Sequence, residues 1–299
     1  MHFYQLYGLT FQSTFPISDL VELSSPEPRS DVTIQLVNDG CMSDYIPQAV
    51  AQQPIAIQIN PHDALVYLQN AGVFIIQGGC KIVLVASQTA KQAQISQALL
   101  GVVLAVLLYQ RGLYILHAST ATIQDTAIAF LGDSGAGKSS ALAAVIDQGF
   151  IGVADDLTAI QISAGHALVY AGVPQMKLSA AAAHQLQLTE KTVKTAPEST
   201  FSFCSKNHSD AVSLQHLYVL EYGPNWSIER IPQQQALIEL LRFSGLKSVL
   251  PMRDRYQFTQ AAKLANHVSL YRLKRPRDLQ QLPKIAQFLK HHIKEYTSR

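Results

Sequence analysis

A nine-residue segment, Gly132–Ser140, carries the clearest chemistry in the chain. It reads G-D-S-G-A-G-K-S-S and fits the phosphate-binding pattern G-x-x-x-x-G-K-[ST], whose glycines let backbone N–H groups turn toward phosphate oxygens. Lys138 would add a full positive charge at the outer phosphates, and Ser139 a hydroxyl ligand for Mg²⁺. We therefore predict a binding loop for ATP with Mg²⁺. The residues assigned to this loop are Gly132, Asp133, Ser134, Gly135, Ala136, Gly137, Lys138, Ser139 and Ser140.

Two adjacent acids, Asp155 and Asp156, form the second chemical group. They follow the loop at a spacing that leaves room for one helix and one strand, which would bring both carboxylates back to the loop at the same sheet edge. One carboxylate can then hold Mg²⁺ while the other accepts the proton of an attacking hydroxyl. The alternative is a helix cap or a turn, because Asp is favoured in both places.

His117 and six basic residues are weaker candidates. His117 precedes the loop by one predicted strand and could point at a transferred phosphoryl group, although a lone His at a strand end is often a hydrogen-bonded structural residue. The basic residues could neutralise charge that develops on the phosphate, but most of them must be solvated surface charges. These six are Lys177, Lys206, Arg242, Arg253, Arg255 and Arg272.

The flanks of the loop predict the elements that would position these groups. Residues 126–131 are a short apolar run typical of a buried strand, and residues 140–147 have helical composition. Strand, glycine loop and helix is the order that the motif requires. The acids lie between two further apolar runs that predict strands, so the whole unit is typical of an α/β fold.

Residues 1 to about 85 contain short apolar or alternating runs separated by turns at 38–40, 60–63 and 77–79, which predict an antiparallel sheet. We divide the chain into a β-rich N-terminal domain (1–90) and a nucleotide-binding domain (91–299). The uncharged segment 92–110 has an apolar part shorter than the roughly 20 residues of a bilayer-spanning helix, and it predicts a core helix. The polar segment 189–210 predicts a mobile stretch over a site.

Bulk properties exclude several classes of protein. The chain has 299 residues, a formal net charge of +2 and 15% charged residues, which argues against a nucleic-acid partner. Its three cysteines are far apart, without C-x-x-C spacing, as expected in a reducing compartment. The N-terminus lacks the basic start and apolar core of a secretory signal. We therefore expect a cytoplasmic protein with no membrane partner.

Three separated motifs then reveal a resemblance. Residues 116–119 (L-H-A-S), 130–139 (F-L-G-D-S-G-A-G-K-S) and 149–156 (G-F-I-G-V-A-D-D) are similar, in order and spacing, to the catalytic domain of HPr serine kinase/phosphorylase. Over its full length the chain looks more like the stand-alone HPr-kinase-like proteins of bacterial peptide-modification clusters, including lasso-peptide kinases. Those proteins also have a β-rich N-terminal portion and end with a segment like 271–277 (Y-R-L-K-R-P-R).

The resemblance implies a P-loop core of the HPr kinase and phosphoenolpyruvate-carboxykinase type, Mg²⁺-ATP as cofactor, and phosphorylation of a hydroxyl, usually a serine. Carried over residue by residue, it makes Asp155 the base, Ser139 and Asp156 the metal partners, and His117 an active-site residue beside Lys138. Homo-oligomers are expected because the bifunctional relatives form hexamers. The phosphorolysis signature of those relatives is not found in this sequence, so neither dephosphorylation nor HPr as the substrate is predicted.

The leading hypothesis is an ATP-dependent kinase acting on a serine-type hydroxyl of a peptide or protein, such as a peptide natural-product precursor. Two alternatives stay open at this point, a kinase of small-molecule hydroxyls and a non-catalytic ATP-binding regulator. An ATP hydrolase is disfavoured, because the sequence shows no convincing arginine finger and no Walker B strand ending in Glu. The sequence does not identify the acceptor.

Overall fold

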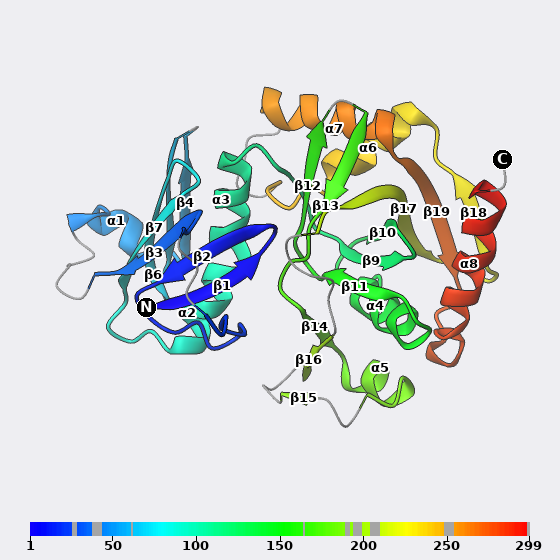
Figure 1. Ribbon diagram of the computed structural model, residues 1–299, viewed down its shortest axis with the longest axis horizontal. Helices are drawn as coiled ribbons and strands as arrows, with labels where there is room; N and C mark the ends of the chain where they lie inside the picture. Colours follow the sequence, from blue (N-terminus) through cyan, green and yellow to red (C-terminus); the bar gives the residue numbers. More distant parts are fainter. Residues whose placement is uncertain are drawn as a thin grey trace.

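The computed structural model of the chain describes residues 1–25, 29–37, 44–60, 62–163, 165–188, 192–193, 199–203, 210–247 and 254–297. Figure 1 shows two large sheets with helices packed on them. The described strands form a seven-stranded, a nine-stranded and a small three-stranded sheet. The predicted mixed α/β class is confirmed, while the assignment to the HPr kinase and carboxykinase type stays a prediction.

The first sheet is built from the N-terminal residues, and six of its seven strands fall close to the predicted runs, whereas β2 was not predicted. Its strands in chain order are β1 (His2–Leu6), β2 (Leu9–Ser13), β3 (Val32–Leu36), β4 (Ile55–Ile59), β5 (Asp63–Leu68), β6 (Gly72–Gln77) and β7 (Lys81–Ala86). A short helix, α1 (Gln48–Ala51), precedes β4. The spatial order is β1-β2-β3-β7-β6-β5-β4.

The prediction that this first sheet is antiparallel is wrong for two of its pairs. β3 lies parallel to β2 on one side and parallel to β7 on the other. Parallel neighbours need long connections, and the chain supplies them between β2 and β3 and between β3 and β7. The predicted turn at residues 77–79 is confirmed by positive φ values at Gly78 and Gly79. The turn predicted at residues 38–40 lies outside the described residues, as does residue 61 of the predicted turn at 60–63.

One long helical segment covers the first sheet. It consists of α2 (Gln92–Ala98), a π-helical turn η2 (Leu99–Val103) and α3 (Leu104–Gln110), and Gly101 within it has non-helical angles (φ −98°, ψ −109°). By length and composition the segment could cross a membrane, but 56% of its most apolar window is buried inside the protein. It shares one apolar cluster with the first sheet. The predicted division at residue 90 therefore separates this helix from the sheet on which it packs.

The second sheet holds the phosphate loop. Its strands are β8 (Tyr114–Leu116), β9 (Ser119–Ile123), β10 (Thr126–Leu131), β11 (Ile151–Ala154), β12 (Thr158–Ser163), β13 (His166–Val169), β17 (Val212–Tyr222), β18 (Ser227–Arg230) and β19 (Ser269–Arg275). They run in the order β11-β9-β10-β17-β13-β12-β8, with β19 on β17 and β18 on β19. The central strands β10, β17 and β19 are parallel to one another.

Helices cover both faces of the second sheet. Ile128 and Phe130 of β10 share a cluster with α4 (Lys138–Asp147) and α8 (Lys284–Thr297), while Ala129 and Leu131 share one with α6 (Gln233–Arg242) and α7 (Arg255–His267). Figure 1 shows α6 and α7 above the sheet and α4 on its other side. Because both faces of β10 are buried, the strand reads as a continuous apolar run. A short 3-10 turn, η3 (Leu279–Gln281), precedes α8.

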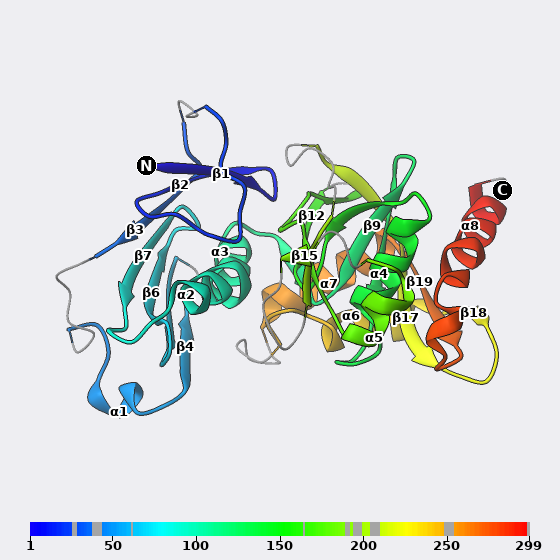
Figure 2. The same cartoon turned by 90° about the horizontal axis from the view of Figure 1, so that it is seen from below.

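The small third sheet consists of β14 (Gln175–Leu178), β15 (Thr192–Val193) and β16 (Ser199–Ser202), with β16 in the middle, and α5 (Ala180–Gln185) follows β14. Most of the segment 189–210 that we predicted to be mobile lies outside the described residues. Its described parts include β15 and β16. Figure 2 shows the first sheet and the second sheet side by side, with the helix 92–110 on the side of the first sheet that faces the second.

Candidate active site

The phosphate loop lies between β10 and α4, as its flanks predict. Gly135 and Gly137 have positive φ values of 81° and 87°, a conformation that favours glycine, and a Cβ on Gly137 would also displace the guanidinium group of Arg275. No side chain caps α4 among the described residues. Its first backbone N–H groups, together with the positive end of the helix, therefore remain suited to an anion.

Lys138 lies under the loop rather than in solvent. Its side chain is buried (6% exposed), and its Nζ donates a hydrogen bond to the Gly132 carbonyl at 3.0 Å. Burial lowers the pKa of Lys138, and the nearby carboxylates of Asp156, Asp155 and Asp133 oppose that shift. The ammonium group is thus held close to the two acids.

The acids occupy a break in an otherwise continuous pair of strands. β9 pairs antiparallel with β11, and β8 pairs antiparallel with β12 in the same register (Thr120 with Ala154, Leu116 with Thr158). Between these pairs, Leu157 N donates to the Asp155 carbonyl at 2.8 Å and closes a tight turn around Asp156. The φ of Asp156 is +65°, a left-handed conformation that costs roughly 1–3 kcal/mol and needs support from the surrounding structure.

Two side chains supply that support. Tyr7, in the turn between β1 and β2, donates from its hydroxyl to the Leu157 carbonyl at 2.9 Å. His117 Nδ1 lies 3.1 Å from the Asp156 carbonyl, and because a carbonyl oxygen only accepts, Nδ1 carries the hydrogen and Nε2 is the basic nitrogen. The N-terminal sheet therefore helps to hold the acid turn, a contact that the sequence did not predict.

Asp155 is the buried member of the acid pair, with 8% of its surface exposed. Its Oδ1 accepts hydrogen bonds from Ser119 Oγ (2.5 Å) and Ser139 Oγ (3.2 Å). Its Oδ2 is buried and has no hydrogen-bond partner among the described residues. Burial, and then the neighbouring Asp156 carboxylate, raise the pKa of Asp155 to about 6, against the effect of the two serines. The pKa of this carboxyl group is therefore shifted toward neutral pH, as the pKa values of general bases are.

Asp156 and His117 lie beside this carboxylate. Asp156 is exposed, and among the acids it has the largest effect on the pKa of Lys138. Burial and the charge of Lys138 lower the pKa of His117, which keeps its imidazole neutral near pH 7. The predicted metal partners Ser139 and Asp156 do not hydrogen bond to each other; Ser139 hydrogen bonds to Asp155 instead.

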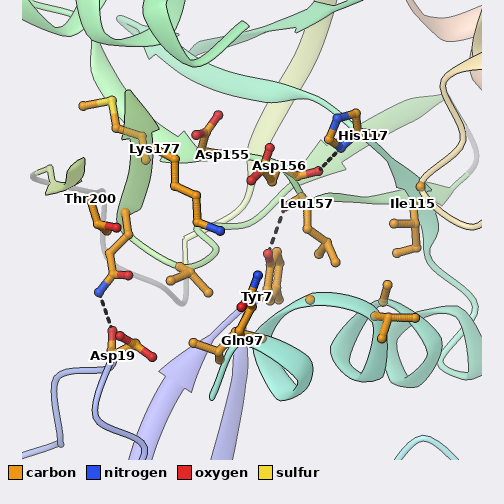
Figure 3. Close-up of a pocket in the computed structure, with 18 of the residues that line it drawn as sticks. Tyr7, Asp19, Gln97, Ile115, His117, Asp155, Asp156, Leu157, Lys177 and Thr200 are labelled. Atoms are coloured by element: carbon orange, nitrogen blue, oxygen red, sulfur yellow. Dashed lines mark hydrogen bonds between the residues drawn. The ribbon is translucent and has the colours of Figure 1, made fainter. Parts of the chain in front are cut away.

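A cavity of about 830 Å³ opens on the other side of the acids (Figure 3). His117, Asp155 and Asp156 line it from the second sheet, and Lys177 of β14 extends its amine into it. The opposite wall comes from the first sheet and the helix that covers it. That wall includes Tyr7, Ile55, Ile57, Gln97 and Gly101. Asp155 thus lies between the phosphate loop and the cavity.

The loop has a second set of neighbours, which the sequence analysis missed. Arg275 is buried (3% exposed) and its Nη2 donates to the Ala136 carbonyl at 3.1 Å. Tyr222 donates from its hydroxyl to the Gly135 carbonyl at 3.2 Å. Tyr222 and Arg275 are the last residues of β17 and β19, the two strands that run parallel to β10. This sheet topology identifies them as neighbours of the loop, and local sequence patterns do not contain it. Ser119 was missed as a partner of Asp155 for the same reason.

The six predicted basic residues separate into three groups. Lys177 lines the cavity, and Arg242 forms an ion pair with Asp133 of the loop at 2.5 Å. Arg272 pairs with Glu221 and Glu239, and Arg255 is exposed on α7. Lys206 and Arg253 lie outside the described residues. The Arg242–Asp133 pair is exposed, so we expect it to contribute little to stability.

The donor atoms at this site suit Mg²⁺. The hydroxyl of Ser139 and the carboxylates of Asp155 and Asp156 are hard oxygen donors, and Asp155 Oδ2 lacks a partner among the described residues. No cluster of three or more His, Cys, Asp or Glu residues that could hold a metal ion occurs in the described part of the chain. Magnesium in phosphoryl-transfer sites needs only one or two carboxylates, because phosphate oxygens and water complete its shell.

Comparisons with known proteins add little. No protein-family model and no curated protein matches the chain. Among solved structures, the chain is similar to the Hpr(Ser) kinase/phosphatase from Coxiella burnetii, with 12% sequence identity, coverage of 62% of this chain and 99% of that chain, and a TM-score of 0.34. A likeness at this level carries no argument about function, which we derive from the site itself.

Proposed function

We propose that this chain is a Mg²⁺-ATP-dependent kinase that transfers the γ-phosphoryl group to a serine-type hydroxyl of a peptide or protein. The observation that carries the proposal is the position of Asp155, whose Oδ1 hydrogen bonds to Ser139 of the phosphate loop while the residue also lines the cavity. A base between nucleotide and acceptor is the arrangement that direct phosphoryl transfer requires.

The chemical step follows from that position. The acceptor hydroxyl enters from the cavity, its oxygen bonds to the γ-phosphorus as the bond to the ADP oxygen breaks, and its proton passes to Asp155. A pKa raised to about 6 leaves Asp155 ionised at neutral pH but close enough to neutrality to accept a proton efficiently. Lys138 and the loop N–H groups hold the outer phosphates, and most of the catalysis is positioning and neutralisation of charge.

We assign Mg²⁺ to the Ser139 hydroxyl and the Asp156 carboxylate. When bound, the ion would neutralise the charge of the β- and γ-phosphate oxygens. The large effect of Asp156 on the pKa of Lys138 supports this assignment, because both groups must then lie near the same phosphates. His117 faces the same cavity, with Nε2 as its basic nitrogen, and we assign it to orienting the acceptor.

Two features of the cavity support a peptide or protein as the acceptor. Its walls come from both sheets, and Ile55 and Ile57 of β4 line it. β4 is the last strand of the first sheet and carries neither a charged residue nor a bulge. An apolar edge strand of this kind offers its backbone to another extended chain.

The test is phosphoryl transfer from γ-labelled ATP with Mg²⁺ into an extract of the native host. The purified chain is compared with Asp155→Asn and with Asp147→Asn, which changes an exposed acid at the end of α4. We expect a protease-sensitive labelled acceptor with the wild type and with Asp147→Asn, and none with Asp155→Asn. A labelled small molecule would establish the small-molecule kinase instead. Tight ATP binding without phosphoryl transfer in a single-turnover experiment would favour the alternative of a non-catalytic ATP-binding regulator.

A further inference from the structure

The phosphate loop has unlike neighbours on its two sides. The parallel strands β10, β17 and β19 end at the same edge of the second sheet, where the loop, Tyr222 and Arg275 follow one another. The acids come from β11, which lies on the opposite side of β10, beyond β9. The loop is therefore flanked by two carboxylates on one side and by an aromatic ring with cations on the other.

We call the second group, Tyr222 with Arg275 and Arg277, the Tyr222 platform. The guanidinium carbons of Arg275 and Arg277 lie 4.9 Å and 5.3 Å from the centre of the Tyr222 ring. Arg275 is buried under the loop, whereas Arg277 is exposed and the Tyr222 ring is 43% exposed. The platform thus presents a partly exposed aromatic ring and an exposed guanidinium group beside the loop.

The direction of a bound nucleotide follows from the position of the acids. In the function proposed above, the γ-phosphate lies near Asp155 and Ser139. A triphosphate that runs along the loop away from the acids carries its ribose and base toward the opposite side of the loop. That side is the Tyr222 platform.

We propose that the nucleobase stacks on Tyr222 and Arg277 of the Tyr222 platform; the inference rests on the proposed function because it takes the orientation of the phosphates from it. Aromatic rings and planar guanidinium groups both stack on nucleobases. Hydrogen bonds from Tyr222 to Gly135 and from Arg275 to Ala136 tie the platform to the loop. The same protein groups therefore set the distance between the phosphate site and the base site.

Calorimetric titration with two ligands tests the inference. A non-hydrolysable ATP analogue carries a base, whereas inorganic tripolyphosphate carries the same three phosphates without one, and both are titrated with Mg²⁺. We expect Arg277→Ala and Tyr222→Leu each to weaken binding of the analogue by about 5- to 100-fold, as losses of base stacking do, and to change tripolyphosphate binding by less than about threefold. Tyr222→Phe keeps the ring and loses only the hydrogen bond to Gly135, so it should weaken binding of the analogue less than Tyr222→Leu does. Arg230→Ala, an exposed arginine at the other end of the β18–β19 pair, is the matched control.

The outcomes separate the two proposals. If the wild type binds neither ligand, the proposed function fails. If it binds both equally well, or if the Arg277 and Tyr222 variants bind the analogue as the wild type does, the platform inference is overturned and the kinase proposal stands. If Arg277→Ala weakened binding of both ligands equally, the platform inference would also be overturned, because Arg277 would then contribute to phosphate binding at the loop rather than to binding of the base. A thermal melt of each variant shows whether the fold is kept.

Discussion

The two sides of the phosphate loop are built in opposite ways. On the acid side, two short strand pairs are interrupted, a non-glycine residue adopts positive φ, and a carboxylate is buried with one oxygen unpaired among the described residues. On the other side, long parallel strands in continuous register carry an aromatic ring stacked with cations. Interrupted strands and a strained non-glycine residue belong to the side that would perform chemistry, while regular parallel strands belong to the side that would only bind.

Lys138→Ala should affect both sides and have the largest effect. The side chain provides the buried positive charge of the loop, and we expect transfer activity to fall below detection and nucleotide affinity to drop by about 100-fold or more, as when a key charge stabiliser is removed. Phosphoryl transfer and calorimetry measure the two effects. Activity above one tenth of the wild-type value would remove this lysine from the mechanism.

Asp155→Asn should impair the function of the acid side of the loop and leave nucleotide binding nearly unchanged. We expect transfer to fall by about 10²- to 10⁴-fold, the usual range for a general base, with affinity for ATP changed by less than about threefold. In the wild type, kcat/KM should decline below pH 6, because the pKa of Asp155 is raised to about 6 and the protonated acid accepts no proton. Full activity of Asp155→Asn with the identified acceptor would refute the role of this residue.

Asp156→Asn should weaken Mg²⁺ binding without removing the general base. If Asp156 and Ser139 hold Mg²⁺, the variant should need about tenfold more Mg²⁺ for half-maximal transfer, since metal sites lose roughly 10- to 100-fold in affinity with such changes. At saturating Mg²⁺ it should recover much of its activity, with a pH profile shifted toward lower pH, because the Asp156 carboxylate that helps to raise the pKa of Asp155 is gone. If the higher Mg²⁺ requirement appears in Asp155→Asn instead, the two roles are exchanged, as the Ser139–Asp155 hydrogen bond allows.

Tyr7→Phe tests whether the first sheet positions the acids. The change removes the hydrogen bond to the Leu157 carbonyl, and we expect transfer to fall by about tenfold with ATP affinity unchanged, because small displacements of reacting groups are costly. Tyr67→Phe is the matched control, since it removes a hydroxyl-to-carbonyl bond of the same length, from β5 to Ala51 of α1. Equal activity losses in the two variants would mean that Tyr7 acts only through stability.

The last prediction concerns stability rather than activity: Asp155→Asn should be the more stable protein. The folded pKa of about 6 lies above the ordinary value of 3.8, so the folded state binds more protons between these values and the free energy of unfolding falls as the pH rises through that window. The buried charge then costs up to about 3 kcal/mol above pH 6. In denaturant unfolding at pH 8, Asp155→Asn should have a higher free energy of unfolding than the wild type, and the difference should disappear near pH 4. No difference at pH 8 would contradict a raised pKa.

Local patterns predicted those parts of the molecule that are set by neighbouring residues. The loop, the strand before it, the helix after it and the acids between two strands follow from glycine spacing and apolar runs, and most strands of the first sheet follow from alternation. The helix α7 was not predicted, because its buried face consists mainly of small alanines beside Leu264 and a glutamine, which make a weak apolar pattern. The parallel position of β3 was also missed, because the strand's own sequence does not determine its partners.

The contacts that define the site depend on pairs distant in sequence. His117 and Ser119 meet the acids because β8 and β9 stay in register with β12 and β11, and Arg275 reaches the loop because β19 lies two strands from β10. Composition and spacing contain no information on such register. They allowed us to name the reacting groups, but neither their supporting residues nor the cavity beside them.

The Tyr7 hydrogen bond also bears on how the chain folds. Tyr7 and Leu157 are 150 residues apart, so the tyrosine leaves the ribosome long before its partner exists. Most of the apolar cluster that the first sheet forms with the helix 92–110 comes from the first 110 residues, and it can collapse while the second sheet is still being synthesised. The acid turn is then completed only when a preformed hairpin tip meets the finished strands. Because contacts of such long sequence separation form late, we expect enzymatic activity to return after most secondary structure during refolding.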